Sequence, residues 1–96
     1  MLFVITAIDK PGSLALRTAT RESHFAYAQA TGAVRLAGPF LDAKGDMAGS
    51  LLIIDLPDLA AAKAWAANDP YAKVGLFAES AVRAWKPTFN GCGADL

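Results

Sequence analysis

The sequence of 96 residues has few cysteines, few histidines and no long apolar run. Cys92 is the only cysteine, which excludes an intrachain disulfide and a metal site built from several cysteines. The uninterrupted apolar runs, such as LLII at 51–54, are far shorter than the roughly 18 to 20 residues that span a bilayer. No secretory signal is visible before the first strand-like residues. We therefore expect a cytoplasmic protein without a membrane segment.

Neither sign of charge is in excess. Nine Lys and Arg balance nine Asp and Glu, so no basic surplus attracts nucleic acid or anionic lipid. The glycines of 38–45 and 45–50 lack the spacing and the Lys-Ser/Thr pair of nucleotide-binding loops. One histidine without clustered carboxylates does not supply the three ligands that a catalytic zinc normally needs. We expect no nucleic acid, no metal and no other cofactor.

Strand-like and helix-like segments alternate along the chain. The first predicted helix stops at Gly32, Asp58 can cap the second, and Pro70 ends it. The predicted order is strand, helix, strand, strand, helix, strand, over residues 2–8, 13–31, 33–40, 50–56, 59–67 and 76–86. An apolar content of 54% and this length predict a single domain over 1–96, with about 88–96 as a flexible tail.

This order is typical of a ferredoxin-like α+β fold, in which both helices lie on one face of a four-stranded antiparallel sheet. The first and third strands should lie in its centre. Antiparallel strands with one solvated face alternate apolar and polar residues, but 2–8 and 51–54 are apolar at both parities. Because two helices cover only one face, we predict a homodimer in which a second copy covers the other sheet face.

The single histidine, His24, lies in the first predicted helix. It falls beside a mostly apolar stripe that should face the sheet, formed by Leu16, Ala19, Ser23, Ala26, Tyr27 and Ala30. An imidazole at such a boundary can titrate near neutral pH, although a lone helix histidine can equally be an ordinary surface residue. A catalytic base needs a partner that fixes its tautomer, and Asp69 after the second helix is the candidate. Asp69 is also an ordinary turn residue.

Several short sequence motifs coincide with these predicted strands, helices and turns. They are MLFVITAIDKPGSLALR (1–17), RESH (21–24), RLAGPF (35–40), GSLLIIDL (49–56), AAAKAWAANDPYAKVGLF (60–77) and KPTF (86–89). The most specific part is DPY at 69–71 with Gly75, combined with a single histidine that follows an arginine by one turn. In these motifs the chain resembles the YCII-related (YciI-like) proteins, a family of dimeric α+β barrel domains.

The resemblance implies a ferredoxin-like fold with paired sheets and a histidine–aspartate dyad, here at His24 and Asp69. It also implies small-molecule chemistry, because one characterised relative removes chloride from a chlorinated hydroxyquinol, while most members have no assigned substrate. The short loop between the second and third strands and the tail NGCGADL (90–96) depart from the family pattern. Because loops shape pockets, the substrate does not transfer with the fold.

Two functions from different classes follow. In the first, the protein is a cofactor-independent lyase, dehydrochlorinase or isomerase that uses His24 and Asp69 for acid–base catalysis. Its predicted substrate-binding residues are Arg17, Arg21, Ser50 and Tyr71. In the second, a non-catalytic dimer binds a small ligand or assists a neighbouring enzyme, and those four residues only pack or contact solvent. Replacing His24 or Asp69 would then leave ligand binding unchanged.

Overall fold

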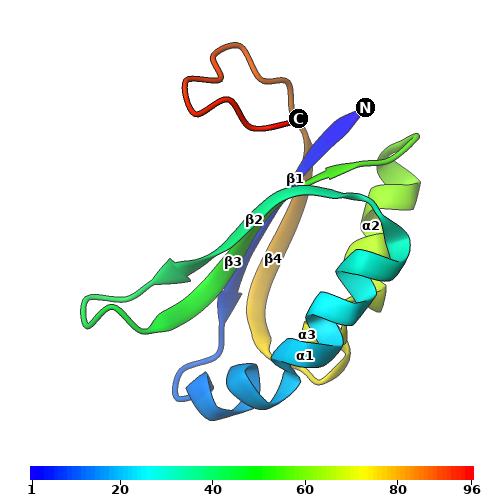
Figure 1. Cartoon of the computed structure of the whole chain (residues 1–96). Helices are drawn as coiled ribbons and strands as arrows, with labels where there is room; N and C mark the ends of the chain where they lie inside the picture. Colours follow the sequence, from blue (N-terminus) through cyan, green and yellow to red (C-terminus); the bar gives the residue numbers. More distant parts are fainter.

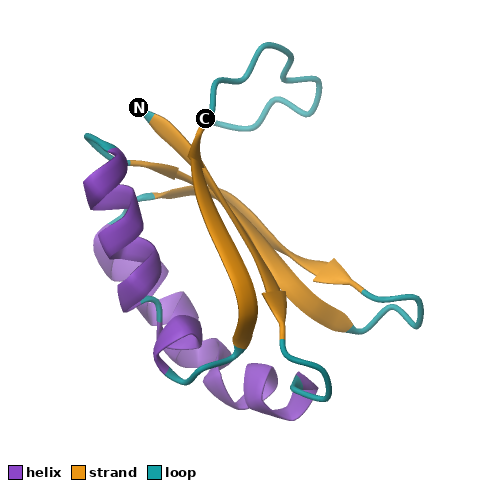
Figure 2. Ribbon diagram, turned by 180° about the vertical axis from the view of Figure 1, so that it is seen from behind, coloured by secondary structure: helices purple, strands orange, loops and turns teal.

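Four strands and three helices succeed one another in the computed structural model, which describes all 96 residues. Their bounds are β1 Leu2–Asp9, α1 Leu14–Thr31, β2 Val34–Leu41, β3 Met47–Asp55, α2 Leu59–Asn68, α3 Pro70–Lys73 and β4 Phe77–Ala84 (Figure 1). The strands form one antiparallel sheet in the order β2-β3-β1-β4, and all helices lie on the same side of it (Figure 2). The predicted ferredoxin-like α+β fold is confirmed. None of the helices has the length and apolar character that a bilayer span requires.

Two predicted helix boundaries are confirmed. Gly32 ends α1 with a positive φ of 64°, a conformation that glycine adopts without steric cost, and its N–H donates to the Ala28 carbonyl at 3.2 Å. Asp58 begins α2, because its carboxylate accepts a hydrogen bond from the Ala61 N–H at 2.8 Å. These caps fix where each helix leaves the sheet.

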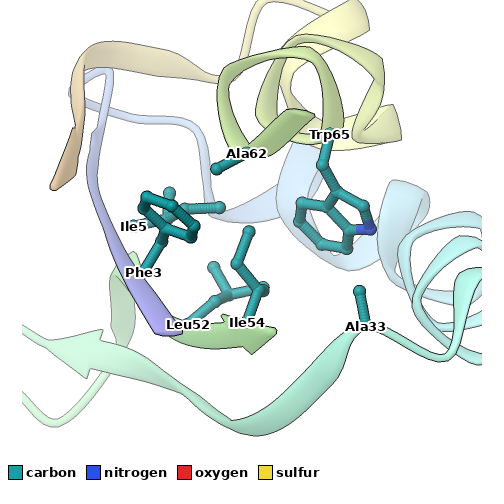
Figure 3. Packing of buried hydrophobic residues seen from close by; sticks show 7 residues of the cluster. All are labelled: Phe3, Ile5, Ala33, Leu52, Ile54, Ala62 and Trp65. Carbon is teal, nitrogen blue, oxygen red and sulfur yellow. The ribbon is translucent and has the colours of Figure 1, made fainter. Parts of the chain in front are cut away.

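The hydrophobic core lies between the helices and the two central strands. The register places Phe3 opposite Ile54 and Ile5 opposite Leu52, so the four side chains point to the same face. The full cluster is Phe3, Ile5, Ala33, Leu52, Ile54, Ala62 and Trp65 (Figure 3). Trp65 also donates from Nε1 to the Thr31 hydroxyl at 2.9 Å, which ties α2 to the end of α1. The core therefore holds both helices against the sheet.

The hairpin between β2 and β3 is longer than the sequence predicts. β3 begins at Met47 rather than Ser50, because Asp42 closes the turn early by accepting hydrogen bonds from the N–H groups of Lys44 and Asp46. Gly49 continues the strand where a β-carbon would overlap the Ala7 carbonyl oxygen. At the other end of the sheet β4 stops at Ala84 instead of residue 86.

The apolar stripe predicted for α1 is wrong. The buried residues of α1 are Arg17, Thr20 and His24, whereas Leu16 is 39% exposed. Asp9 accepts hydrogen bonds from the buried Arg17 guanidinium, and Asp69 forms a hydrogen bond with the buried His24 ring. Because these polar groups have partners, the polar face of α1 turns inward. The helix thus contributes functional groups to the inner side of the sheet.

The face of the sheet opposite the helices has no covering element (Figure 2). Val4 and Ile8 on β1 point to this face, since their neighbours in sequence point into the core. Ile8 and Leu36 are each 43% exposed. Glu79 and Arg83 on β4 stand opposite Ile8 and Val4 in the register and therefore share the same open face. We call this surface the open sheet face.

Candidate acid–base site

His24 and Asp69 meet, as the sequence predicts. Asp69 is the residue between α2 and α3, and its Oδ1 lies 2.8 Å from Nδ1 of His24 on α1. His24 is 7% exposed and Asp69 is 3% exposed. Asp69 Oδ1 also accepts the Tyr71 N–H at 3.0 Å and so caps α3, a turn of helix that the sequence analysis did not anticipate. As an acceptor, the carboxylate places the proton of the neutral imidazole on Nδ1. The other ring nitrogen is left with a free lone pair.

The orientation of the His24 ring is fixed by stacking. The Tyr71 ring lies parallel to it, with centroids 4.2 Å apart and an interplanar angle of 19°. Every side-chain nitrogen or oxygen that is fully buried has a hydrogen-bond partner. Because His24 Nε2 has no partner within the chain, it is not fully buried and is accessible. His24 also lines a cavity. The arrangement of a held imidazole with one accessible basic nitrogen is that of a general base.

Arg17 is bound by a carboxylate that the sequence analysis missed. Its Nε and Nη2 donate to the two oxygens of Asp9 at 2.7 and 2.9 Å, and Nη2 also donates to Ser50 Oγ at 2.8 Å. Burial works against the charge of Arg17, but Asp9, through its hydrogen bond and negative charge, and Tyr71 together outweigh it and raise the pKa of Arg17. Side chains alternate between the two faces along β1, so Asp9 lies on the same core face as Phe3 and Ala7. This alternation could have predicted that Asp9 points inward.

The cavity beside His24 has a volume of about 210 Å³. One side is polar and comes from α1 and α3, with Arg17, Arg21, His24 and Tyr71. The facing wall comes from the β2–β3 hairpin and consists of Ala37, Gly38, Pro39, Met47, Ser50, Leu51 and Leu52. Since a cavity of roughly 150 Å³ holds a benzene molecule, this one accommodates a single substituted ring. All six predicted site residues, with Ser50 included, therefore lie in or directly beside one cavity.

Burial keeps the phenol of Tyr71 protonated. It raises the pKa of Tyr71 above 10.0, with Asp69 adding to the increase and the positive charges of Arg17 and Arg21 opposing it. Burial and the charge of Asp69 likewise raise the pKa of Tyr27. Tyr71 is thus available at neutral pH as a hydrogen-bond donor to an oxygen in the cavity.

These shifts predict the alkaline behaviour of the protein. In the folded state both tyrosines should form phenolate at a higher pH than in urea, measured by phenolate absorbance. Because the unfolded chain loses these protons first, the free energy of unfolding should fall as pH rises above about 10. Tyr71→Phe should remove one of the two delayed titrations. Two tyrosines that titrate alike in folded and unfolded protein would contradict the assignment.

No three His, Cys, Asp or Glu side chains of the chain cluster in an arrangement that could hold a metal ion. The groups that line the cavity are an imidazole paired with a carboxylate, two guanidinium groups, a phenol and a hydroxyl. Together with a ferredoxin-like fold, they define a small α+β domain with an acid–base type of cavity at the edge between helix and sheet.

The YCII-related domain model matches residues 1–86, and the chain belongs to this family. An uncharacterised protein from Haemophilus influenzae is 38% identical over 98 aligned positions, which cover 93% of this chain and all of that protein. Protein YciI from Escherichia coli is 37% identical over the same coverage. The family assignment that the motifs suggested is confirmed.

Solved structures agree with this assignment. The 5-chloro-2-hydroxyhydroquinone dehydrochlorinase TftG from Burkholderia phenoliruptrix, in complex with 2,5-dihydroxybenzoquinone, is 36% identical and superimposes with a TM-score of 0.83, covering 99% of this chain and all of that one. An antibiotic biosynthesis monooxygenase shares 18% identity at a TM-score of 0.55, over 91% of this chain and all of that one. The second similarity concerns the fold alone.

Proposed function

We propose that the protein is a cofactor-independent enzyme that performs acid–base chemistry on a small cyclic molecule, as a lyase of the dehydrochlorinase type or an isomerase. The observation that carries this proposal is the His24–Asp69 pair at 2.8 Å with Nε2 accessible beside a cavity the size of one ring. Support also comes from the 36% identical relative that is named a dehydrochlorinase. In this proposal His24 and Asp69 are catalytic, and Arg17, Arg21, Ser50 and Tyr71 bind or position the substrate.

The proposed chemistry needs only groups of this chain. His24 Nε2 takes a proton from an O–H or C–H of the ring, and Asp69 stabilises the imidazolium that forms. The electron pair of the broken bond moves into the ring. In an elimination the substrate reacts as a keto tautomer with the leaving group on a saturated ring carbon, so the electron pair forms a new C=C bond to that carbon and expels chloride, and a proton and a chloride are lost together. In an isomerisation His24 returns the proton to another atom instead. Tyr71 donates a hydrogen bond to the oxygen on which negative charge grows.

A substrate screen tests the proposal. The protein is incubated with 5-chloro-2-hydroxyhydroquinone and with other halogenated or unhalogenated hydroquinones, and halide release and the absorbance of quinone products are recorded. Catalysis predicts turnover above the rate in buffer that disappears in His24→Asn. The rival function, a ligand-binding or accessory module, predicts that the same compounds raise the melting temperature but are returned unchanged.

We also propose that the open sheet face pairs with a second copy of the chain. Val4, Ile8 and Leu36 form an apolar surface there that the helices on the other side cannot cover. Glu79 and Arg83 lie on the same face, are exposed and have no ion-pair partner within the chain. A two-fold axis that crosses β4 midway between them would bring Glu79 of one copy toward Arg83 of the other, which makes the face complementary to itself.

Two matched variants test the dimer. Leu36→Glu places a charge on the open sheet face, and Leu59→Glu places the same charge on α2, at nearly equal exposures of 43% and 42%. We expect sedimentation to show a dimer whose dissociation constant rises at least about tenfold in Leu36→Glu, because pairing of the faces would bury a carboxylate in an apolar surface without a partner. Leu59→Glu should remain a dimer. A wild-type monomer at micromolar concentration would refute the pairing.

A further inference from the structure

Arg21 is the one charged group of the cavity that no carboxylate of the chain compensates. It lies one turn after Arg17 on α1 and lines the cavity, but it takes part in no ion pair and no side-chain hydrogen bond. Its guanidinium carbon lies over the ring of Phe25, 5.1 Å from the centroid. This contact holds the cation beside the cavity and leaves its donors free.

The other charged side chains of the site already have partners within the chain. Asp9 neutralises Arg17, and Asp69 is paired with His24. None of the twelve residues that line the cavity is Asp or Glu. Among the side chains that line the cavity, Arg21 is therefore the cation whose donors remain free for a ligand, because the Asp69 carboxylate lies outside the lining and is held by His24 and the Tyr71 N–H.

Arg17 cannot take over this role. It is 3% exposed, and its Nε and Nη2 already donate to Asp9 and Ser50. Its guanidinium carbon lies over the Tyr71 ring at 4.6 Å from the centroid. Arg17 is thus a positioning residue, which holds Ser50 and Tyr71 in place toward the cavity.

The geometry points to Arg21 as the residue that selects the substrate, by binding an anionic oxygen of a small, single-ring molecule. A phenolate, an enolate or a carboxylate fits this description, since the guanidinium fork matches such oxygens. The apolar hairpin wall with Pro39 and Met47 contacts the uncharged part of the ring. This inference rests on the proposed function and adds the charge of its substrate.

Binding of matched anionic and neutral ligands tests the inference without turnover. Salicylate is compared with salicylamide, and 2,5-dihydroxybenzoquinone with its dimethyl ether, by calorimetry at neutral pH. We expect the wild type to prefer the anion of each pair, and Arg21→Gln to weaken anion binding by about tenfold or more while neutral binding changes less than about twofold. The preference should shrink as salt is added.

Three further variants distinguish anion binding at Arg21 from a general effect of positive charge and from acid–base catalysis at His24. Lys63→Gln removes one positive charge from exposed α2 and should keep the full preference, and Arg21→Lys should keep part of it. If Arg21→Gln retains the preference, or if the wild type binds neither anion at millimolar concentration, the inference is wrong. His24→Asn should retain anion preference. Should His24→Asn also keep full turnover, the acid–base proposal fails while the anion site stands.

Discussion

His24→Asn and Asp69→Asn are each expected to lower turnover by roughly 10²- to 10⁴-fold, the contribution typical of a positioned acid–base group. His24→Asn removes the accessible basic nitrogen. Asp69→Asn removes the charge that supports the imidazolium, but its side-chain oxygen can still cap α3 at the Tyr71 N–H. Steady-state kinetics on the substrate found in the screen gives the measurement. Because the two residues act as one unit, the double variant should be scarcely worse than either single variant.

Asp58→Asn is the matched control. Asp58 caps α2 through the same kind of hydrogen bond, to the Ala61 N–H, but contacts no group of the cavity. It should keep wild-type turnover with a small change in stability. Losses that multiply in the double variant, or a single variant with full activity, would show that the two side chains work independently and that the dyad is not catalytic.

Asp9→Asn is expected to lower the free energy of unfolding by roughly 3–5 kcal/mol, the cost of leaving a buried charge without its partner. The Arg17 guanidinium is buried and donates hydrogen bonds to both oxygens of Asp9, and no other carboxylate forms an ion pair with it. Urea denaturation at a fixed protein concentration gives the measurement, since a dimer would make stability depend on concentration.

A double variant shows where this loss comes from. Asp9→Leu combined with Arg17→Met removes both charges and fills the space with apolar groups, which is often neutral for stability. The double variant should therefore be more stable than Asp9→Asn. Asp55→Asn, which breaks exposed pairs with Arg35 and the amino terminus, should have a much smaller effect. Equal losses in Asp9→Asn and the double variant would mean that backbone packing, not charge, dominates at this position.

Local patterns were sufficient to predict the order of the elements apart from the short helix α3, and several of their ends. Gly32 and Asp58 act through their own backbone and the adjacent turn, so their effect is visible in the sequence. The meeting of His24 and Asp69 followed from placing both helices on one sheet face and from the family motifs. The cytoplasmic location and the flexibility of residues 88–96 stay predictions.

Long-range pairing explains what the sequence did not predict. A helical wheel ranks faces by apolarity, and it cannot know that Arg17 will find a carboxylate on β1. The apolar stripe was wrong for that reason. Asp9 was missed because it precedes Lys10 and Pro11, where a turn was expected, although its parity matched the buried face. The early start of β3 depended on side-chain hydrogen bonds of Asp42, which a propensity pattern does not contain.

The two walls of the cavity differ in how closely they are connected to the hydrophobic core. The polar wall stands on helices that Trp65 and its neighbours anchor, whereas the hairpin residues Pro39, Met47 and Leu51 lie outside the hydrophobic cluster. Leu52 of the same hairpin belongs to that cluster and Gly49 has no room for a β-carbon, so substitutions at Pro39, Met47 and Leu51 encounter the least structural constraint. A descendant of this protein can acquire a new ligand repertoire by altering those three positions while it retains the His24–Asp69 pair, which gives the scaffold a simple route to diversification.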